Sequence, residues 1–86
     1  MFVVYVLYSH SADRLYFGQT SDLRKRFNQH NAGESKATKH GIPWKLIYYE
    51  AFASATDARI RERRLKKFGN SYSALKKRLQ NSLENS

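Results

Sequence analysis

Residues 15–30 read LYFGQTSDLRKRFNQH and decide the fold, because they pass from a strand through a turn into a helix. The aromatic pair Tyr16 and Phe17 is typical of a strand. Gly18 follows, and glycine tolerates backbone angles that are closed to other residues. The letters TSD at 20–22 are all favourable N-caps, so we expect a helix to begin there.

The predicted helix runs from Ser21 to Asn31 and places three of its side chains on one face. Leu23, Phe27 and His30 share that face, and Arg26 lies beside them. A guanidinium and an imidazole one turn apart, next to an apolar stripe, can point along the edge of a core. We therefore expect these two groups to face a shared pocket.

The rest of the chain adds two strands and two helices around this stretch. The first strand is almost continuously apolar, so we expect it to be central, with both faces covered. The predicted class is α+β, a single β-β-α-β-α domain over residues 1–80, with a three-stranded antiparallel sheet flanked by helices. The strands are predicted over Phe2–Tyr8, Leu15–Gln19 and Trp44–Phe52, a second helix from 54–57 to Phe68 before Gly69, a short last helix over Tyr72–Leu79 capped by Ser71, and a polar tail over 81–86.

The loop from Asn31 to Pro43 is long for so small a domain. Long ordered loops are often functional, and this one carries Lys36 and Lys39. A flexible connection with incidental lysines is the alternative interpretation.

The second helix carries an acidic residue, Glu62, within its apolar face. The residues that share this face at helical spacing are Ala55, Ala58, Leu65 and Phe68. A carboxylate directed at a core is costly unless it is paired or binds a cation. A salt bridge to Arg26 or to another arginine is the competing explanation, and Ile60 does not fit the pattern because it falls on the basic face.

The composition restricts the class of protein. The 86 residues contain no cysteine, which excludes disulfides and thiolate metal sites and fits a reducing cytoplasm. No apolar run approaches the ~20 residues that span a bilayer, so no membrane role is expected. The net charge of +9 favours a polyanionic partner such as DNA or RNA, although charge can also serve solubility alone.

The order of elements and several exact letters resemble the GIY-YIG nuclease domain in its small stand-alone form, over roughly residues 2–68. In that family one strand ends in Gly-Ile-Tyr and the next bears Tyr-Ile-Gly; here the two motifs read Val3-Val4-Tyr5 and Tyr16-Phe17-Gly18. The arginine, histidine and glutamate of the family match Arg26, His30 and Glu62. The departure is the pair of valines in the first motif.

The resemblance implies metal-dependent hydrolysis of a DNA phosphodiester, in the manner of excision-nuclease subunits in DNA repair. Glu62 would hold one divalent cation, Mg²⁺ or Mn²⁺. Tyr5 would be the general base for the attacking water, and Tyr16 would position water or phosphate. Arg26 matches phosphate oxygens, and His30 would orient Tyr5 or shuttle a proton.

Substrate binding is expected to rest on backbone phosphates, because nothing in the chain resembles a base-reading module. The candidate contacts are Gly18, Lys36, Lys39, Arg59, Arg63, Arg64, Lys66 and Lys67. A separate protein partner would then supply targeting. Two other function classes stay open: a non-catalytic nucleic-acid-binding module, and a small basic subunit that docks an acidic protein.

Overall fold

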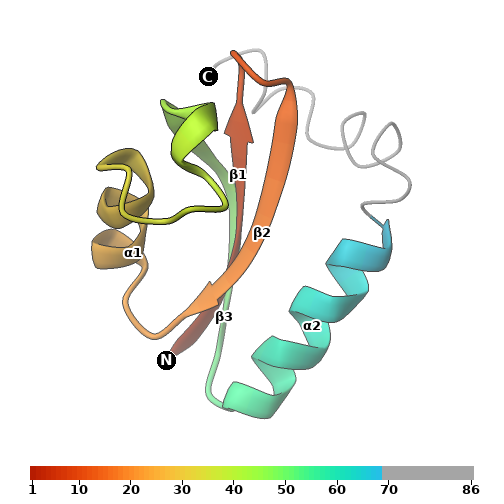
Figure 1. The fold of residues 1–86 in the computed structure, drawn as a ribbon. Helices are drawn as coiled ribbons and strands as arrows, with labels where there is room; N and C mark the ends of the chain where they lie inside the picture. The colour runs from red at the N-terminus through yellow and green to blue at the C-terminus, as the bar shows by residue number, and fades with distance from the viewer. Residues whose placement is uncertain (69–86) are drawn as a thin grey trace.

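The computed structural model describes residues 1–68 and confirms the predicted order of elements within them (Figure 1). The elements are β1 (Phe2–Ser9), β2 (Arg14–Thr20), α1 (Leu23–Asn31), the short 3₁₀ helix η1 (Lys39–Gly41), β3 (Trp44–Phe52) and α2 (Ala55–Phe68). The class is α+β, as predicted. The expected stop at Gly69, the cap at Ser71, the last helix over Tyr72–Leu79 and the tail over 81–86 lie outside the described residues.

The three strands form one antiparallel sheet in the order β2-β1-β3. β1 is therefore central, as its continuous apolarity predicts, and its residues from Val4 to Ser9 are all buried. Tyr5 lies opposite Gly18 on β2 and opposite Tyr49 on β3. Because β1 and β2 form a hairpin, the two tyrosine motifs of the sequence are neighbours in space.

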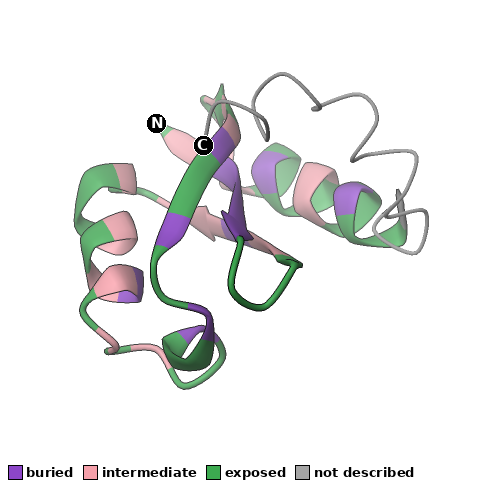
Figure 2. Cartoon of the chain, turned by 90° about the horizontal axis from the view of Figure 1, so that it is seen from above, coloured by how far each residue is buried: buried purple, intermediate pink, exposed green. Residues whose placement is uncertain are grey.

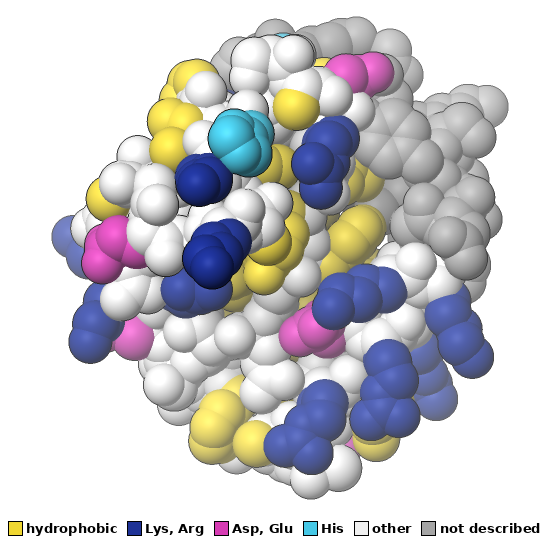
Figure 3. Space-filling model, viewed as in Figure 1, with side chains coloured by type: hydrophobic (Ala, Val, Ile, Leu, Met, Phe, Trp, Pro, Cys, Tyr) yellow, Lys and Arg dark blue, Asp and Glu magenta, His cyan; other side chains and the backbone are white. Residues whose placement is uncertain are grey.

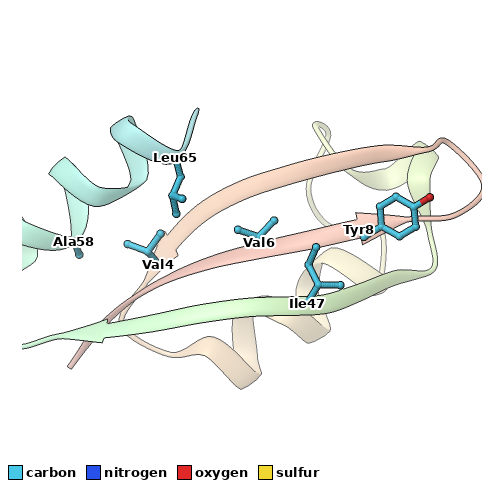
Figure 4. Packing of buried hydrophobic residues seen from close by; sticks show 6 residues of the cluster. All are labelled: Val4, Val6, Tyr8, Ile47, Ala58 and Leu65. Carbon is cyan, nitrogen blue, oxygen red and sulfur yellow. The ribbon is translucent and has the colours of Figure 1, made fainter. Parts of the chain in front are cut away.

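The two helices cover opposite faces of the sheet (Figures 1 and 2). We call these the α1 face and the α2 face. On the α2 face, Val4 and Val6 of β1 pack with Ala58 and Leu65 of α2 in an aliphatic cluster (Figure 4). On the α1 face, Tyr5, which lies between Val4 and Val6 in β1, forms a second buried cluster with Leu7 and Trp44. The partly buried Tyr16, Leu23 and Phe27 pack against this cluster.

The third strand departs from simple alternation. Trp44, Leu46 and Tyr48 alternate in the sequence with Lys45, Ile47 and Tyr49, but Leu46 is exposed, whereas Ile47 is buried with the α2-face cluster. The cause is a register shift against β1, where Val6 pairs with Tyr48 and the next residue pairs with Leu46. Such a bulge adds one residue to one strand and turns the side chains that follow.

The helix ends follow their caps. Asp22 caps α1, with its Oδ1 accepting from the Lys25 N–H at 3.1 Å, so the helix begins two residues later than expected. Gly33 follows α1 with a φ of +79°, the left-handed conformation that terminates helices. Ser54 caps α2 through an Oγ that accepts from the Asp57 N–H at 3.3 Å.

Candidate functional site

The α1 face holds a cluster of two phenols and one imidazole, in which Tyr5 and His30 are buried and Tyr16 is half-buried. The Tyr5 hydroxyl is 2.8 Å from His30 Nε2, and both residues are at most 1% exposed. The Tyr16 ring lies 4.9 Å from the His30 ring and 6.4 Å from the Tyr5 ring, measured between centroids. Strands β1 and β2 and helix α1 thus bring these three predicted site residues together.

Gly18 is the residue that lets the Tyr5 side chain lie across β2. A Cβ atom at Gly18 would overlap the Cζ and hydroxyl of Tyr5, so the phenol lies directly over this glycine. β2 is an edge strand, so the Tyr5 hydroxyl lies over a strand at the edge of the sheet. The sequence predicts a phosphate contact at Gly18, and the structure places the Tyr5 phenol where a side chain at this residue would lie.

The charges of Arg26 and Glu62 both act on Tyr5. Burial, followed by the neighbouring Tyr16, raises the pKa of Tyr5 to about 12. The Arg26 guanidinium lowers this pKa and the Glu62 carboxylate raises it, so both groups lie within electrostatic reach of the phenol. At neutral pH the Tyr5 phenol therefore keeps its proton.

Glu62 comes from α2 and so approaches from the opposite face of the sheet. Its neighbour Arg61 bonds to Glu50 of β3 at 2.8 Å, which fixes that flank of α2 toward β3. Successive helix residues are rotated by about 100°, so Glu62 lies on the other flank of the buried Ala58–Leu65 line, toward β2. Glu62 therefore faces β2 from the α2 side of the sheet, and its charge acts on the Tyr5 phenol from that side.

The partner of Glu62 differs from the predicted alternative. Its Oε2 lies 2.9 Å from Lys66 Nζ, one turn along the same helix, and within residues 1–68 no arginine forms a salt bridge with it. The Glu62 side chain is 20% exposed and the Lys66 side chain 55%. Such an exposed pair holds its carboxylate only weakly.

A divalent cation fits this site only as a weakly held ion. No group of three or more His, Asp or Glu side chains that could hold a metal occurs in the described part of the chain. Mg²⁺ commonly takes one or two protein carboxylates, several waters and substrate phosphate. Glu62 is partly exposed, and its one ion pair within residues 1–68 is with the exposed Lys66, so it meets that modest requirement.

The sequence did not identify the residues that lie beside His30 Nδ1, the ring nitrogen that faces away from Tyr5. His30 Nδ1 lies 2.7 Å from the Thr38 hydroxyl, and the Thr38 carbonyl accepts from Trp44 Nε1 at 2.6 Å. Asn31 in turn bonds to both the N–H and the carbonyl of Trp44, at 2.7 and 3.1 Å. Burial, with the Arg26 charge as the second cause, lowers the pKa of His30, which is therefore neutral at pH 7.

Gly18 lies against Tyr5, but the basic residues predicted as nucleic-acid contacts do not form one group with Tyr5 and His30. Ile60 and three basic residues of α2 line a hollow of about 190 Å³; these three are Arg63, Arg64 and Lys67. Ile60 lies across the helix from the buried Ala58 and Leu65, so this hollow faces away from the sheet. The other predicted contacts on α2, Arg59 and Lys66, are exposed, as are Lys36 and Lys39 on the loop. Figure 3 shows basic side chains over both helices, with apolar side chains between them.

A second polar cluster on the α2 face was also missed from the sequence. Glu50 of β3 accepts from Tyr48 of the same strand and from Arg61 of α2. The Tyr48 hydrogen bond is the main cause that lowers the pKa of Glu50. The alternating letters of β3 could not reveal this pairing, because it depends on how α2 crosses the strand.

No helix among the first 68 residues is long and apolar enough to cross a membrane. The chain was then compared with known proteins. The family described as the GIY-YIG catalytic domain matches residues 1–78. UPF0213 proteins of Streptococcus pyogenes serotype M5 (strain Manfredo) and serotype M1 are each 46% identical over 54 residues, which cover 62% of this chain and 59% of the relative. The chain thus spans about three fifths of the length of these curated relatives. No solved structure matches it.

Proposed function

The chain belongs to the GIY-YIG catalytic-domain family, and from this premise we propose that it is a metal-dependent endonuclease that hydrolyses phosphodiester bonds of DNA. One observation carries the proposal. The Tyr5 phenol is hydrogen-bonded to a buried, neutral His30 and lies over the edge strand β2, where Arg26 and Glu62 both act on its pKa. This combines an acid–base pair with a phosphate-binding cation and a carboxylate.

The proton path in this proposal runs through Tyr5 to His30. The attacking water forms a new bond to phosphorus and gives its proton to the Tyr5 oxygen. Tyr5 passes its own proton to His30 Nε2, 2.8 Å away, so no free phenolate is needed. This exchange suits a phenol whose pKa is about 12, because the phenol acts as a relay and not as a resting base. The oxygen on the far side of phosphorus leaves with the electron pair of the broken bond.

Arg26 and Tyr16 bind and orient the phosphate in this proposal. Arg26 is half-buried at the α1 face, and its guanidinium carries a permanent charge with a fork that matches two phosphate oxygens. Arg26 is held on one side by its Nη1–H, which donates to Gln29 Oε1 at 3.1 Å. The Tyr16 hydroxyl would position the water or the phosphate beside the Tyr5–His30 pair.

Glu62 would hold the divalent cation, Mg²⁺ or Mn²⁺. When bound, the cation offsets the negative charge that develops on the phosphate and the leaving oxygen. The basic contacts predicted on the loop and on α2 would bind backbone phosphates along the DNA, and the net charge of +9 supports such salt-dependent, sequence-independent binding. Because these contacts do not read bases, a protein partner would supply targeting.

Nicking of supercoiled plasmid DNA with Mg²⁺ or Mn²⁺ tests the proposal. Wild-type protein should nick the plasmid, and EDTA should stop it. Arg26→Ala and Glu62→Ala should each lower the rate at least about 100-fold, because each removes charge stabilisation in the transition state. Arg24→Ala and Glu34→Ala are matched controls, since both side chains are exposed and lie outside the Tyr5 cluster. Activity that survives Arg26→Ala and Glu62→Ala would reject the assigned site.

A non-catalytic nucleic-acid-binding module is the second candidate, favoured by the burial of Tyr5 at 1% exposure. It predicts DNA or RNA affinity that falls steeply with salt and does not respond to Mg²⁺. Lack of any nucleic-acid affinity at low salt would instead support a subunit that docks an acidic protein.

A further inference from the structure

Thr38 occupies an unusual position at the end of the hydrogen-bond chain that starts at Tyr5. It lies at the N-cap position of η1, yet its hydroxyl makes no capping hydrogen bond. A threonine at an N-cap ordinarily directs its oxygen at a helix N–H. Here the hydroxyl is 2.7 Å from His30 Nδ1 and the residue is 1% exposed. The Thr38 hydroxyl therefore contacts His30 of the candidate site and does not cap η1.

The backbone of Thr38 is fixed independently of this contact. Its N–H donates to the Ser35 carbonyl at 3.2 Å, and its carbonyl accepts from the Gly41 N–H at 3.0 Å and from Trp44 Nε1 at 2.6 Å. Trp44 is itself tied to the end of α1 by the two hydrogen bonds of Asn31. The long loop between α1 and β3 therefore holds the hydroxyl rigidly behind His30.

The positions of the protons in the Tyr5–His30–Thr38 hydrogen bonds follow from the donors and acceptors present. Among the described residues, His30 Nε2 is the only acceptor hydrogen-bonded to the Tyr5 hydroxyl, because the neighbouring Arg26 can only donate. The Tyr5 O–H is assigned as the donor to Nε2, because Arg26 beside the phenol already donates to the Tyr5 oxygen. In a neutral imidazole the proton then resides on Nδ1, facing the Thr38 oxygen.

We propose that Thr38 is a positioning residue that accepts the Nδ1–H of His30 and so fixes the tautomer in which Nε2 receives the Tyr5 proton. The inference rests on the proposed nuclease function for its catalytic meaning, but the tautomer itself is independent of it. When His30 takes up the Tyr5 proton, the same Thr38 oxygen continues to accept from Nδ1–H, so no group has to turn.

Nitrogen NMR of the imidazole ring, recorded on ¹⁵N-histidine-labelled protein at neutral pH, tests the tautomer directly. Wild-type His30 should show a protonated Nδ1 and an unprotonated Nε2. Thr38→Val keeps the shape and removes the acceptor, so the Nδ1-protonated fraction should fall, while Thr38→Ser should restore it. Thr56→Val is the matched control, because Thr56 is exposed on α2. His10 and His40 are exposed, which separates their signals from the buried His30.

Cleavage kinetics provide the second readout. Thr38→Val should lower kcat about tenfold, the effect of one lost hydrogen bond, with KM for DNA unchanged within about twofold, and Thr38→Ser should recover most of kcat. A wild-type His30 protonated on Nε2, or a tautomer unmoved by Thr38→Val, would overturn the inference. If Thr38→Val does not fold, the wild-type and Thr38→Ser spectra still decide. If His30 carries its proton on Nδ1 but the protein cleaves no DNA, the proposed nuclease function is rejected. The positioning role of Thr38 is then still supported.

Discussion

The two faces of the sheet bury side chains equally well but to different ends. On the α2 face, Val4 and Val6 of the central strand pack against Ala58 and Leu65 in an aliphatic cluster (Figure 4). On the α1 face, the intervening Tyr5 begins a buried chain of hydroxyl, imidazole and hydroxyl groups. Alternate residues of β1 therefore build an aliphatic cluster on one side and a chain of hydrogen-bonded polar groups on the other.

The difference teaches that one small domain can bury polar and apolar side chains on opposite faces of the same sheet. Buried polar groups are costly unless every one has a partner, and among the described residues no buried side-chain nitrogen or oxygen lacks one. The polar chain of the α1 face therefore stays inexpensive only while each of its members keeps its partner. The aliphatic cluster of the α2 face is stabilised by non-directional burial of apolar surface.

Tyr5→Phe should separate the faces most sharply. It removes the proton relay, so we expect the cleavage rate to fall about 10²- to 10⁴-fold. It also leaves His30 Nε2 without its partner, which should lower the free energy of unfolding by about 1–3 kcal/mol. Nicking assays and urea unfolding measure the two effects. Unchanged cleavage by folded Tyr5→Phe protein would contradict the role of Tyr5.

Val6→Ala is the converse change, on the α2 face. Deleting two buried methyl groups should lower the free energy of unfolding by about 2 kcal/mol, from lost burial plus the remaining cavity. The kcat of the folded protein should stay within about twofold of wild type. A large loss of kcat, with the fold intact by circular dichroism, would mean that the two faces are coupled.

Acid should weaken the two faces in different pH ranges. The lowered pKa of His30 means that the unfolded chain binds more protons below pH 6.5, so stability falls as the pH drops through that range. The lowered pKa of Glu50 preserves its contribution above its ordinary value of 4.5, and the contribution is lost at lower pH. Each group alters stability by at most about 1.4 kcal/mol per pH unit.

Urea unfolding between pH 7 and pH 3 distinguishes these ranges. His30→Gln should flatten the dependence just below pH 6.5, and Glu50→Gln should flatten it below pH 4.5. An identical pH profile for both variants would show that neither group titrates as its surroundings indicate.

Lys66→Ala should have the smallest effect, on the flank of α2 that carries Glu62. The exposed Lys66–Glu62 pair contributes little, so the free energy of unfolding should change by less than about 0.5 kcal/mol. Removal of the ammonium frees the carboxylate, and Mn²⁺ affinity, measured by calorimetry, should rise about twofold. Weaker Mn²⁺ binding in this variant would argue against Glu62 as the ligand.

Local patterns in the sequence predicted most of the fold. The continuous apolar run of Phe2–Tyr8 indicated a central strand, and the caps before α1 and α2 located both helices. The bulge at Ile47 was not predictable, because it depends on the pairing of β3 with β1 and not on the letters of β3 itself.

The candidate site was only partly visible in the sequence. The pairing of Tyr5 with His30 follows from residues that stand out by type, once the hairpin and helix are in place. The roles of Thr38 and Asn31 could not be predicted, because a threonine and an asparagine are common residues in loops and helix ends. Their roles depend on the contacts of Trp44, which is hydrogen-bonded to both residues. The roles assigned to these residues in catalysis and DNA binding stay predictions.

The single tryptophan of the chain gives this protein a built-in optical probe. Trp44 is buried on the α1 face, with its indole N–H bonded to the Thr38 carbonyl and its ring 6.3 Å from Tyr16. Its fluorescence therefore reports the loop behind His30, and excitation of Tyr16 should be transferred to it. Because the aliphatic cluster contains no tryptophan, changes in emission will follow events on the α1 face without any attached dye.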